Sequence, residues 1–424
     1  MTVSHTVTDR SLLGRYAVFG AALAFAGPPI YIHTPALYAE NHAMSLAAVG
    51  GVLLGLRMLD FIQDPLLGWF IARTRIAQRW LSAGFGLLLA VGALLLFAPE
   101  PLFDPRWWLA LSLVLVFTGF SALQILFYSA GVGIAAGRGI GHPAIAGWRE
   151  AGILIGVSAA CVAPAMLAIA AGEAWAYTVF ALLFCVLLAV AVRRMFPFWP
   201  AGFTTATAPG AEPGGFWSLL GDSGVRRLLL IGLVNALPTG ITATLFLFFV
   251  QDRLAAPEHT GPALLLFFLA AAAAAPLWAR IAARTGSKPA MLTGMALSVA
   301  VFAIALTLGE GDWAAFYVIS AVSGAAVGAD MTLLPAMLSR RLAEAGHSPG
   351  HAFGLWGFVN KFSLALAAGL ALPALGAAGF APGAVNTPEA LGTLSLAYAG
   401  VPCALKAIAA LILLITPIQE RPHA

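Results

Sequence analysis

Apolar stretches long enough to cross a lipid bilayer recur along this sequence, and no other feature constrains its fold as strongly. A bilayer-spanning helix needs about 20 predominantly apolar residues. Of the 424 residues, 61% are hydrophobic and only 9% are charged, whereas about 25% of the residues of a soluble domain are charged. The composition therefore excludes a soluble globular protein and predicts an all-α integral membrane protein.

We predict twelve transmembrane helices from these stretches. The predicted spans lie near residues 16–38, 45–72, 80–98, 107–135, 144–170, 176–192, 228–250, 261–283, 289–308, 314–338, 352–378 and 391–416. When the connecting segments are placed alternately on the two sides, most Lys and Arg residues fall on the side of both termini. The positive-inside rule then predicts that both termini are cytoplasmic, and we expect a bacterial-type inner membrane.

The polar segment 193–227 is rich in Pro, Gly and Thr and separates six spans from six. It predicts a cytoplasmic linker between an N-terminal half, residues 1–192, and a C-terminal half, residues 228–424. Within the linker, residues 216–220 are a candidate for a short helix on the membrane surface.

The two halves resemble each other in sequence. Segment 65–74, with Pro-Leu followed by Ala-Arg-Thr, recurs as segment 276–285, and Arg149 and Lys361 are separated by nearly the same offset. A cation in the fifth span and another in the eleventh thus occupy matching positions. This pattern indicates parallel repeats about an axis normal to the membrane.

The span near 45–72 holds Arg57, Asp60 and Asp64 within an apolar stretch. Each charge near the bilayer centre costs about 2.5–3.5 kcal/mol on insertion, so these side chains must face protein or water. At about 100° per residue the three lie within about 60° of arc, and Gln63 lies about 60° from Asp60. One arginine cannot neutralise two carboxylates, which predicts a site for Na⁺ or H⁺. A buried salt bridge that only joins this helix to its neighbour is the alternative.

Other charged residues also lie in predicted spans, and each has two interpretations. Arg149 either contacts solute or extends to the membrane surface from a helix start, and its neighbour Glu150 should point about 100° away from it. Lys361 lies deeper and is a candidate for pairing or for binding solute. Asp330 is a candidate for an ion pair that closes a cytoplasmic gate or for a coupling role. Lys406 is expected to bind a carbonyl or to reach the interface.

Several neutral polar residues are candidates for the lining of a central cavity. They are Gln124, Tyr128, Asn235, Trp356 and Asn360. Hydrogen bonding between helices would explain each of them equally well.

The sequence motifs of this chain resemble those of a known family. The motif Arg57-x-x-Asp60-x-x-Gln63-Asp64-Pro65-x-x-Gly68 is similar to that of the glycoside-pentoside-hexuronide:cation symporters, and segments 275–288, 328–330 and 353–361 are similar to their spans eight, ten and eleven. The resemblance covers essentially the whole chain. It implies a major-facilitator fold in two six-helix halves and cation-coupled solute uptake by alternating access. The acidic pair Asp60 and Asp64 would then hold Na⁺ if the coupling ion is sodium.

Two departures from the family bear on mechanism. Residues 16–37 contain no Asp or Glu, and Phe25 stands where the family's sugar transporters have an acid. Gln124 stands where the family adds an acid to its cation site, so Asp60, Gln63, Asp64 and Gln124 form the expected coupling set. An amide oxygen can ligate Na⁺, but the lower negative charge makes a protonatable pair relatively more plausible.

We therefore expect a symporter of a small polar organic solute with Na⁺ or H⁺. Arg149 and Lys361 would give the cavity positive charge, which favours an anionic or glycosidic solute. An amphipathic or lipid-like solute is the alternative, and a non-transporting membrane sensor is a further one. The sequence contains no nucleotide-binding G-x-x-x-x-G-K-[ST] motif and no H-E-x-x-H motif. We expect no enzyme activity, no cofactor, no nucleic-acid partner, and a monomer surrounded by membrane lipid.

Overall fold

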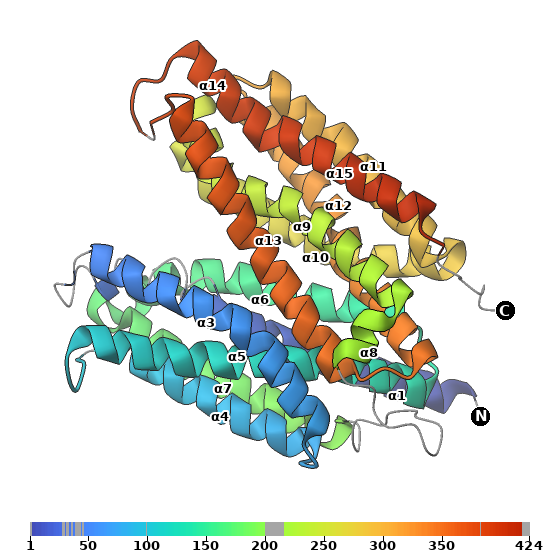
Figure 1. Cartoon of the computed structure of the whole chain (residues 1–424). Coiled ribbons are helices and arrows are strands. Elements are labelled where there is room, and N and C mark those ends of the chain that lie inside the picture. The colour runs from blue at the N-terminus through green and yellow to red at the C-terminus, as the bar shows by residue number, and fades with distance from the viewer. Residues whose placement is uncertain are drawn as a thin grey trace. The chain divides into compact units, whose positions relative to one another are not determined.

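The computed structural model describes residues 2–27, 30, 34, 37–38, 44, 46–98, 100–199, 216–381 and 383–417. Every regular element in these residues is helical (Figure 1). The helices that precede the linker are α1 (Thr2–Phe25), α3 (Leu46–Arg73), α4 (Gln78–Leu96), α5 (Pro105–Arg138), α6 (His142–Ala171), α7 (Glu173–Met195) and the short η2 (Phe196–Phe198). The fold class predicted from composition is thus confirmed.

A second series of helices follows the linker. It comprises α8 (Phe216–Gly221), α9 (Ser223–Phe248), η3 (Phe249–Arg253), η4 (Pro257–His259), α10 (Thr260–Thr285), α11 (Ser287–Phe302), η5 (Ala303–Thr307), α12 (Trp313–Ala345), α13 (Pro349–Ala377), α14 (Pro388–Ser395), η6 (Leu396–Gly400) and α15 (Val401–Ile415). The predicted short helix at 216–220 forms as α8.

Ten helices in the described part of the chain are long and apolar enough to cross a membrane. The other two predicted spans correspond to α1 and α3. Parts of these two predicted spans lie outside the described residues, and α3 also contains Arg57, Asp60 and Asp64. Together the helices agree with a twelve-helix transporter fold.

The helices form two compact units. The first comprises Met1–Ile140, Trp148–Leu219 and Leu342–Phe358, and the second comprises Gly141–Gly147, Leu220–Arg341 and Val359–Ala424. The first unit therefore includes the first residues of α13, and the remainder of that helix belongs to the second unit. The second unit includes the first residues of α6, and the remainder of that helix belongs to the first unit. The predicted halves and the linker at 193–227 stay a prediction, because residues 200–215 lie outside the described part of the chain.

Close helix packing in the first unit depends on glycine. A Cβ atom on Gly152 of α6 would lie 2.1 Å from the carbonyl oxygen of Ala17 on α1, and one on Gly156 would lie 2.2 Å from that of Ala21. Such distances are far below van der Waals contact. The small residues therefore let the backbones of α1 and α6 approach each other, which is the main source of stable packing between helices in lipid. Within this unit α3 also packs along α5, and α4 along α5 and α7 (Figure 1).

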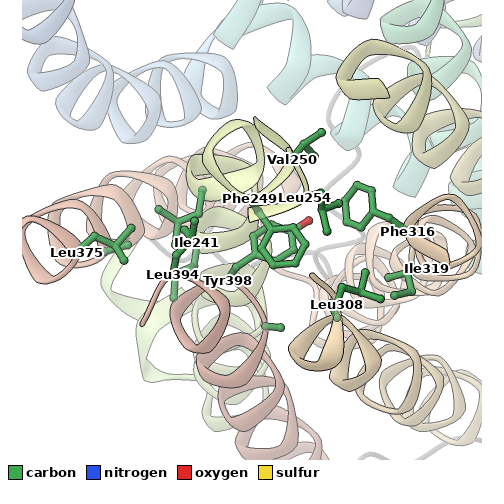
Figure 2. Packing of buried hydrophobic residues seen from close by; sticks show 14 of the residues in the cluster. Ile241, Phe249, Val250, Leu254, Leu308, Phe316, Ile319, Leu375, Leu394 and Tyr398 are labelled. Carbon is green, nitrogen blue, oxygen red and sulfur yellow. The ribbon is translucent and has the colours of Figure 1, made fainter. Parts of the chain in front are cut away.

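A hydrophobic core that includes several aromatic rings packs between helices of the second unit (Figure 2). Phe249 and Tyr398 stack with ring centroids 4.1 Å apart and an interplanar angle of 12°. They lie on η3 and η6, two π-helical turns in which the backbone widens locally. Phe316 of α12 packs against Phe249 at 5.7 Å. Helices that are distant in sequence are thus fixed to one another, which positions the polar residues farther along them.

Candidate functional site

Three polar side chains form a buried cluster in the first unit. Arg149 and Glu150 of α6 are each 1% exposed, and Tyr128 of α5 lies beside them. Arg149 Nε lies 2.8 Å from Glu150 Oε1, and the Tyr128 hydroxyl donates to the same oxygen at 3.0 Å. The guanidinium carbon lies 3.8 Å from the centroid of the Tyr128 ring. The cluster thus combines an ion pair, a hydrogen bond to charge and a cation–π contact.

The cluster retains unused hydrogen-bonding capacity. Arg149 Nη2 and Glu150 Oε2 are buried and have no hydrogen-bond partner among the described residues. An unpaired buried donor or acceptor is costly, so both atoms are available to a polar ligand. Tyr16 of α1 closes one side of the cluster, where its hydroxyl donates to the carbonyl of Phe127 at 2.6 Å.

The structure excludes one of the two interpretations of Arg149 and corrects the expectation for Glu150. Arg149 does not extend from the bundle, because its side chain is buried inside the first unit. Glu150 does not turn away from it either. Adjacent Cβ atoms on a helix diverge by about 100°, but both side chains are long enough to curve back and meet at one oxygen.

The predicted cation site lies on α3. Asp64 is 1% exposed, and a Cβ atom placed on Gly357 of α13 would lie 2.7 Å from Asp64 Oδ2. The carboxylate therefore lies directly against the α13 backbone within the first unit. Gln63 is half-buried, and its Nε2 has no hydrogen-bond partner among the described residues. The side chains of Arg57 and Asp60 lie outside the described part of the structure.

The remaining predicted residues are distributed between the units. Gln124 is half-buried on α5, which packs along α3. Trp356 is half-buried in the first unit, whereas Asn360 is exposed and Lys361 half-buried in the second. The expectation that Arg149 and Lys361 both give one cavity positive charge concerns residues of two units and stays a prediction. Among the described residues there is no group of three or more His, Cys, Asp or Glu that could hold a metal ion.

A second buried polar cluster, in the second unit, was not predicted as such. Lys406 of α15 donates to Asn235 Oδ1 of α9 at 2.8 Å and forms a hydrogen-bonded ion pair with Asp330 Oδ2 of α12. The alternative that Lys406 reaches the interface was wrong, because it is 3% exposed. Its donation to the amide carbonyl oxygen of Asn235 agrees with the expected carbonyl contact, whereas the ion pair with Asp330 was not expected. Asp330 does form an ion pair, but its role in a gate stays a prediction.

The depth of the three residues within their helices could have indicated this cluster from the sequence. At about 1.5 Å per residue, Asn235 lies roughly 18 Å from the start of α9, and Lys406 roughly 14 Å from the end of α15. Asp330 lies near the middle of α12. Three polar residues at similar depth in apolar helices tend to pair with one another, because lipid satisfies none of them.

A bundle of apolar helices with a buried cation–carboxylate pair in each of two units is that of a polytopic membrane protein, and the family that the chain matches makes it a transporter, not an enzyme. A family model described as "MFS/sugar transport protein" matches residues 15–420, and the chain belongs to this family of the major facilitator superfamily. The resemblance to the glycoside-pentoside-hexuronide type of transporter is therefore confirmed. No curated protein matches the chain.

Solved structures of major facilitator transporters resemble the whole chain. The transporter FucP, crystallised in the outward conformation, has 12% sequence identity and a TM-score of 0.67, covering 96% of this chain and 99% of its own. A bacterial homologue of the iron transporter ferroportin, in an outward-facing state, has 14% identity and a TM-score of 0.68, covering 96% of this chain and 98% of its own. At such identities the likeness establishes the fold alone.

Proposed function

We propose that this protein is a secondary active transporter that moves a small polar organic solute together with Na⁺ or H⁺ by alternating access. The observation that carries the proposal is the burial of Asp64, a full carboxylate inside a membrane-spanning helix. An ionisable residue at such a place is costly and usually belongs to an ion pathway. Asp60, one turn earlier on the same helix, would add a second carboxylate, with Arg57 as their ion-pair partner.

Gln63 and Gln124 would complete the coupling set. An amide oxygen is a suitable ligand for a hard cation such as Na⁺, and Pro65 interrupts the backbone hydrogen bonds of α3 beside the carboxylate. If the coupling ion is H⁺, Asp60 and Asp64 would share the proton, because two close carboxylates do not both stay ionised. Both ions are compatible with the same residues, and the experiment below separates them.

The positive charges of Arg149 and Lys361 support an anionic or glycosidic solute, for instance a uronate. The unpartnered Nη2 of Arg149 can donate to a carboxylate or hydroxyl, and the Tyr128 ring lies beside it. Lys361 is the matching cation of the C-terminal half, and Trp356 and Asn360 are the further candidates for binding solute. A sugar-like solute also agrees with the family's description.

One observation favours an amphipathic solute as the second candidate. Phe25, which stands where the family's sugar transporters have an acid, is buried and stacks on Phe180 at 5.0 Å with an interplanar angle of 16°. Phe25 thus packs inside the first unit and supplies no hydrogen-bond acceptor for a sugar hydroxyl. A solute with an apolar portion, which needs fewer such acceptors, is therefore the second candidate.

The proposed orientation has both termini in the cytoplasm of a cell with a bacterial-type inner membrane, and the proposed state is a monomer in lipid. Single cysteines at Arg75 and Arg340 test the orientation. Both should react with a membrane-impermeant maleimide only from the cytoplasmic side. Labelling of Arg75→Cys from outside alone would contradict the orientation and the number of spans.

A ligand screen by thermal shift, with and without Na⁺ at two pH values, would identify the solute. Uptake of that solute into proteoliposomes then tests coupling. Asp64→Asn should abolish concentrative uptake and leave folding intact, because a neutral group of similar shape cannot attract the ion. Loss of uptake when choline replaces Na⁺ at fixed pH indicates sodium, whereas indifference to choline with uncoupling by a protonophore indicates protons. Wild-type accumulation by both Asp60→Asn and Asp64→Asn would refute the site.

A further inference from the structure

The second unit contains a cavity beside its buried ion pair. It lies between α9, α10, α11, α12 and α15 and has a volume of about 50 Å³. A water molecule needs roughly 10–15 Å³ of such space, so the cavity accommodates several waters or a small organic group. Phe267, Val299, Phe302 and Val327 form apolar walls, and Lys406 contributes the only charged side chain of the lining in the described residues.

The ammonium of Lys406 has a donor left for a ligand. It carries three N–H groups, of which one reaches Asn235 Oδ1 and one reaches Asp330 Oδ2. The third can therefore donate to a group in the cavity that the side chain lines. A cation would be repelled by the ammonium, whereas an anion would be attracted to it.

Charge balance adds a second requirement. Lys406 and Asp330 neutralise each other, so an anion entering the cavity would leave one uncompensated negative charge in a buried site. Asp330 Oδ1 is buried and has no hydrogen-bond partner among the described residues. A proton on this oxygen would restore neutrality without displacing an existing contact.

We infer that the cavity binds a monocarboxylate with an apolar body together with one proton. The carboxylate accepts a hydrogen bond from Lys406, its apolar body packs against Phe267 and Phe302, and the proton resides on Asp330. A dianion such as phosphate does not fit, because the site supplies one cation and one unpartnered acid oxygen. The inference goes beyond the proposed coupling site, since it requires no residue of α3.

Among the described residues that line the cavity or contact Asp330, no other carboxylate, imidazole or amine competes with Asp330 and Lys406 for the proton. The groups that face Asp330 are Lys406 of α15 and Asn235 of α9. Among the described residues that line the cavity, those of α9, α10, α11 and α12 carry no ionisable side chain, and α15 adds the thiol of Cys403. One proton per anion makes the apparent dissociation constant of the anion rise about tenfold for each unit of pH.

The test is stabilisation of the purified full-length protein against thermal unfolding by benzoate, with neutral benzamide as the matched probe, at pH 6 and pH 7. We expect benzoate to stabilise the protein, with a half-saturating concentration about tenfold higher at pH 7, and benzamide to have no effect. In Asp330→Asn, a mimic of the protonated acid, the benzoate response should become independent of pH. The double variant Lys406→Met/Asp330→Asn removes both charges together, so no unpaired charge remains, and it should not respond.

Equal stabilisation by benzoate and benzamide, or a benzoate response of the wild-type protein that does not change with pH, would overturn the inference without any variant. A benzoate response retained in the double variant would do the same. The Asp64→Asn variant separates this site from the proposed coupling site, because it should lose concentrative uptake but keep the pH-dependent benzoate response. If Asp64→Asn loses uptake and the wild-type protein ignores benzoate, only the present inference fails.

Discussion

Arg149 lies over the face of Tyr128, with its guanidinium carbon 3.8 Å from the ring centroid. The hydroxyl of the same tyrosine donates to Glu150 Oε1, which also accepts from Arg149 Nε. Tyr128 thus contacts the cation through its ring and the carboxylate through its hydroxyl. It orients a buried ion pair that leaves one guanidinium nitrogen for a ligand, so its two contributions can be separated by substitution.

Tyr128→Phe keeps the ring and removes the hydroxyl. A hydrogen bond to a charged group contributes about 1.5–3 kcal/mol, so we expect a loss of stability in that range. Tyr128→Leu removes the cation–π contact as well, which adds about 2 kcal/mol at a buried site. Thermal unfolding of the purified variants measures both losses. Equal losses of stability in the two variants would mean that the contact of the ring with Arg149 adds nothing to stability beyond the hydrogen bond of the hydroxyl.

Gly357→Ala should disturb the proposed cation site without disturbing the fold. The new Cβ atom would lie 2.7 Å from Asp64 Oδ2, so the carboxylate must move by several tenths of an ångström. Distances in a metal site lie within about 0.2 Å of their ideal values, so a larger shift of a ligand should weaken Na⁺ binding. Changes next to metal ligands typically lower metal affinity about 10–100-fold, and we expect a loss on the order of tenfold here. The measurement is the cation concentration that gives half-maximal uptake in proteoliposomes.

The matched control is Gly369→Ala on the same helix, where a Cβ atom meets nothing within 4 Å. This variant should behave as the wild type or be slightly more stable, since alanine favours the helix. Equal cation dependence of Gly357→Ala and Gly369→Ala would show that the Asp64 carboxylate does not take part in coupling.

The positions of the helices follow closely from the sequence, because hydropathy alone marks the membrane-spanning segments. The span predicted near 80–98 forms α4 at Gln78–Leu96. The span predicted near 314–338 forms the longer α12, which ends at Ala345. The prediction ended too early there because Arg340 and Arg341 are polar, and a hydropathy criterion cannot detect a helix that continues beyond the apolar segment.

The polar clusters were less predictable, because they depend on side-chain reach and on contacts between distant helices. A helical projection separated Arg149 from Glu150 although their long side chains meet. Lys406 and Asn235 are 171 residues apart, and nothing local in either helix specifies the other. The free-energy cost of burying a polar side chain in lipid indicates that Lys406 and Asn235 each need a polar partner. Which residue that partner is depends on how the helices pack.

Gly152→Ala should loosen the packing of α6 on α1. The added Cβ atom would lie 2.1 Å from the carbonyl oxygen of Ala17, a backbone atom that cannot rotate away, so the two helices must separate. Overpacking of this kind costs typically about 1–3 kcal/mol. Gly137→Ala on α5 is the control, because a Cβ atom there meets open space. This substitution should stabilise the protein by about 0.4–1 kcal/mol. Similar unfolding temperatures for the two variants would contradict the close approach.

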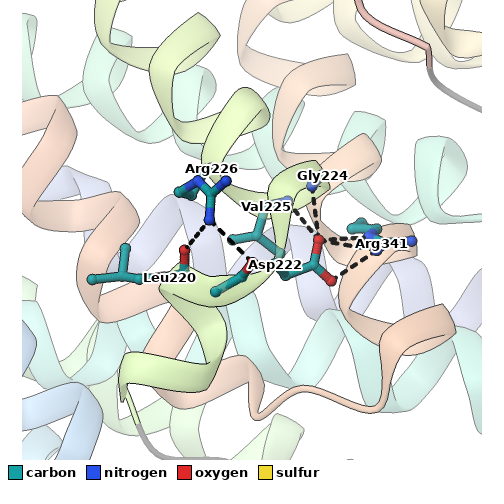
Figure 3. Close-up of polar contacts among 7 residues, drawn as sticks. Leu220, Asp222, Gly224, Val225, Arg226 and Arg341 are labelled. Carbon is teal, nitrogen blue, oxygen red and sulfur yellow. Dashed lines mark hydrogen bonds and ion pairs between the residues drawn. The ribbon is translucent and has the colours of Figure 1, made fainter.

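Asp222 combines two roles at the start of α9 that substitutions can separate (Figure 3). Its Oδ1 accepts from the backbone amides of Gly224 at 2.8 Å and Val225 at 3.2 Å, and its carboxylate pairs with Arg341, whose Nη2 lies 2.8 Å from Oδ2. The amide contacts cap the helix, and the ion pair joins α9 to the end of α12.

Asp222→Asn keeps a good capping side chain and loses only the ion pair, whereas Asp222→Ala loses both. Because the Arg341 side chain is 40% exposed, solvent screens the pair, and we expect Asp222→Asn to lose no more than about 1 kcal/mol. Asp222→Ala should lose a further 0.5–2 kcal/mol or so from the missing cap. Arg341→Gln removes the pair from the other side and should match Asp222→Asn in thermal unfolding. If Asp222→Asn proves as unstable as Asp222→Ala, the ion pair and not the cap holds this end of α9.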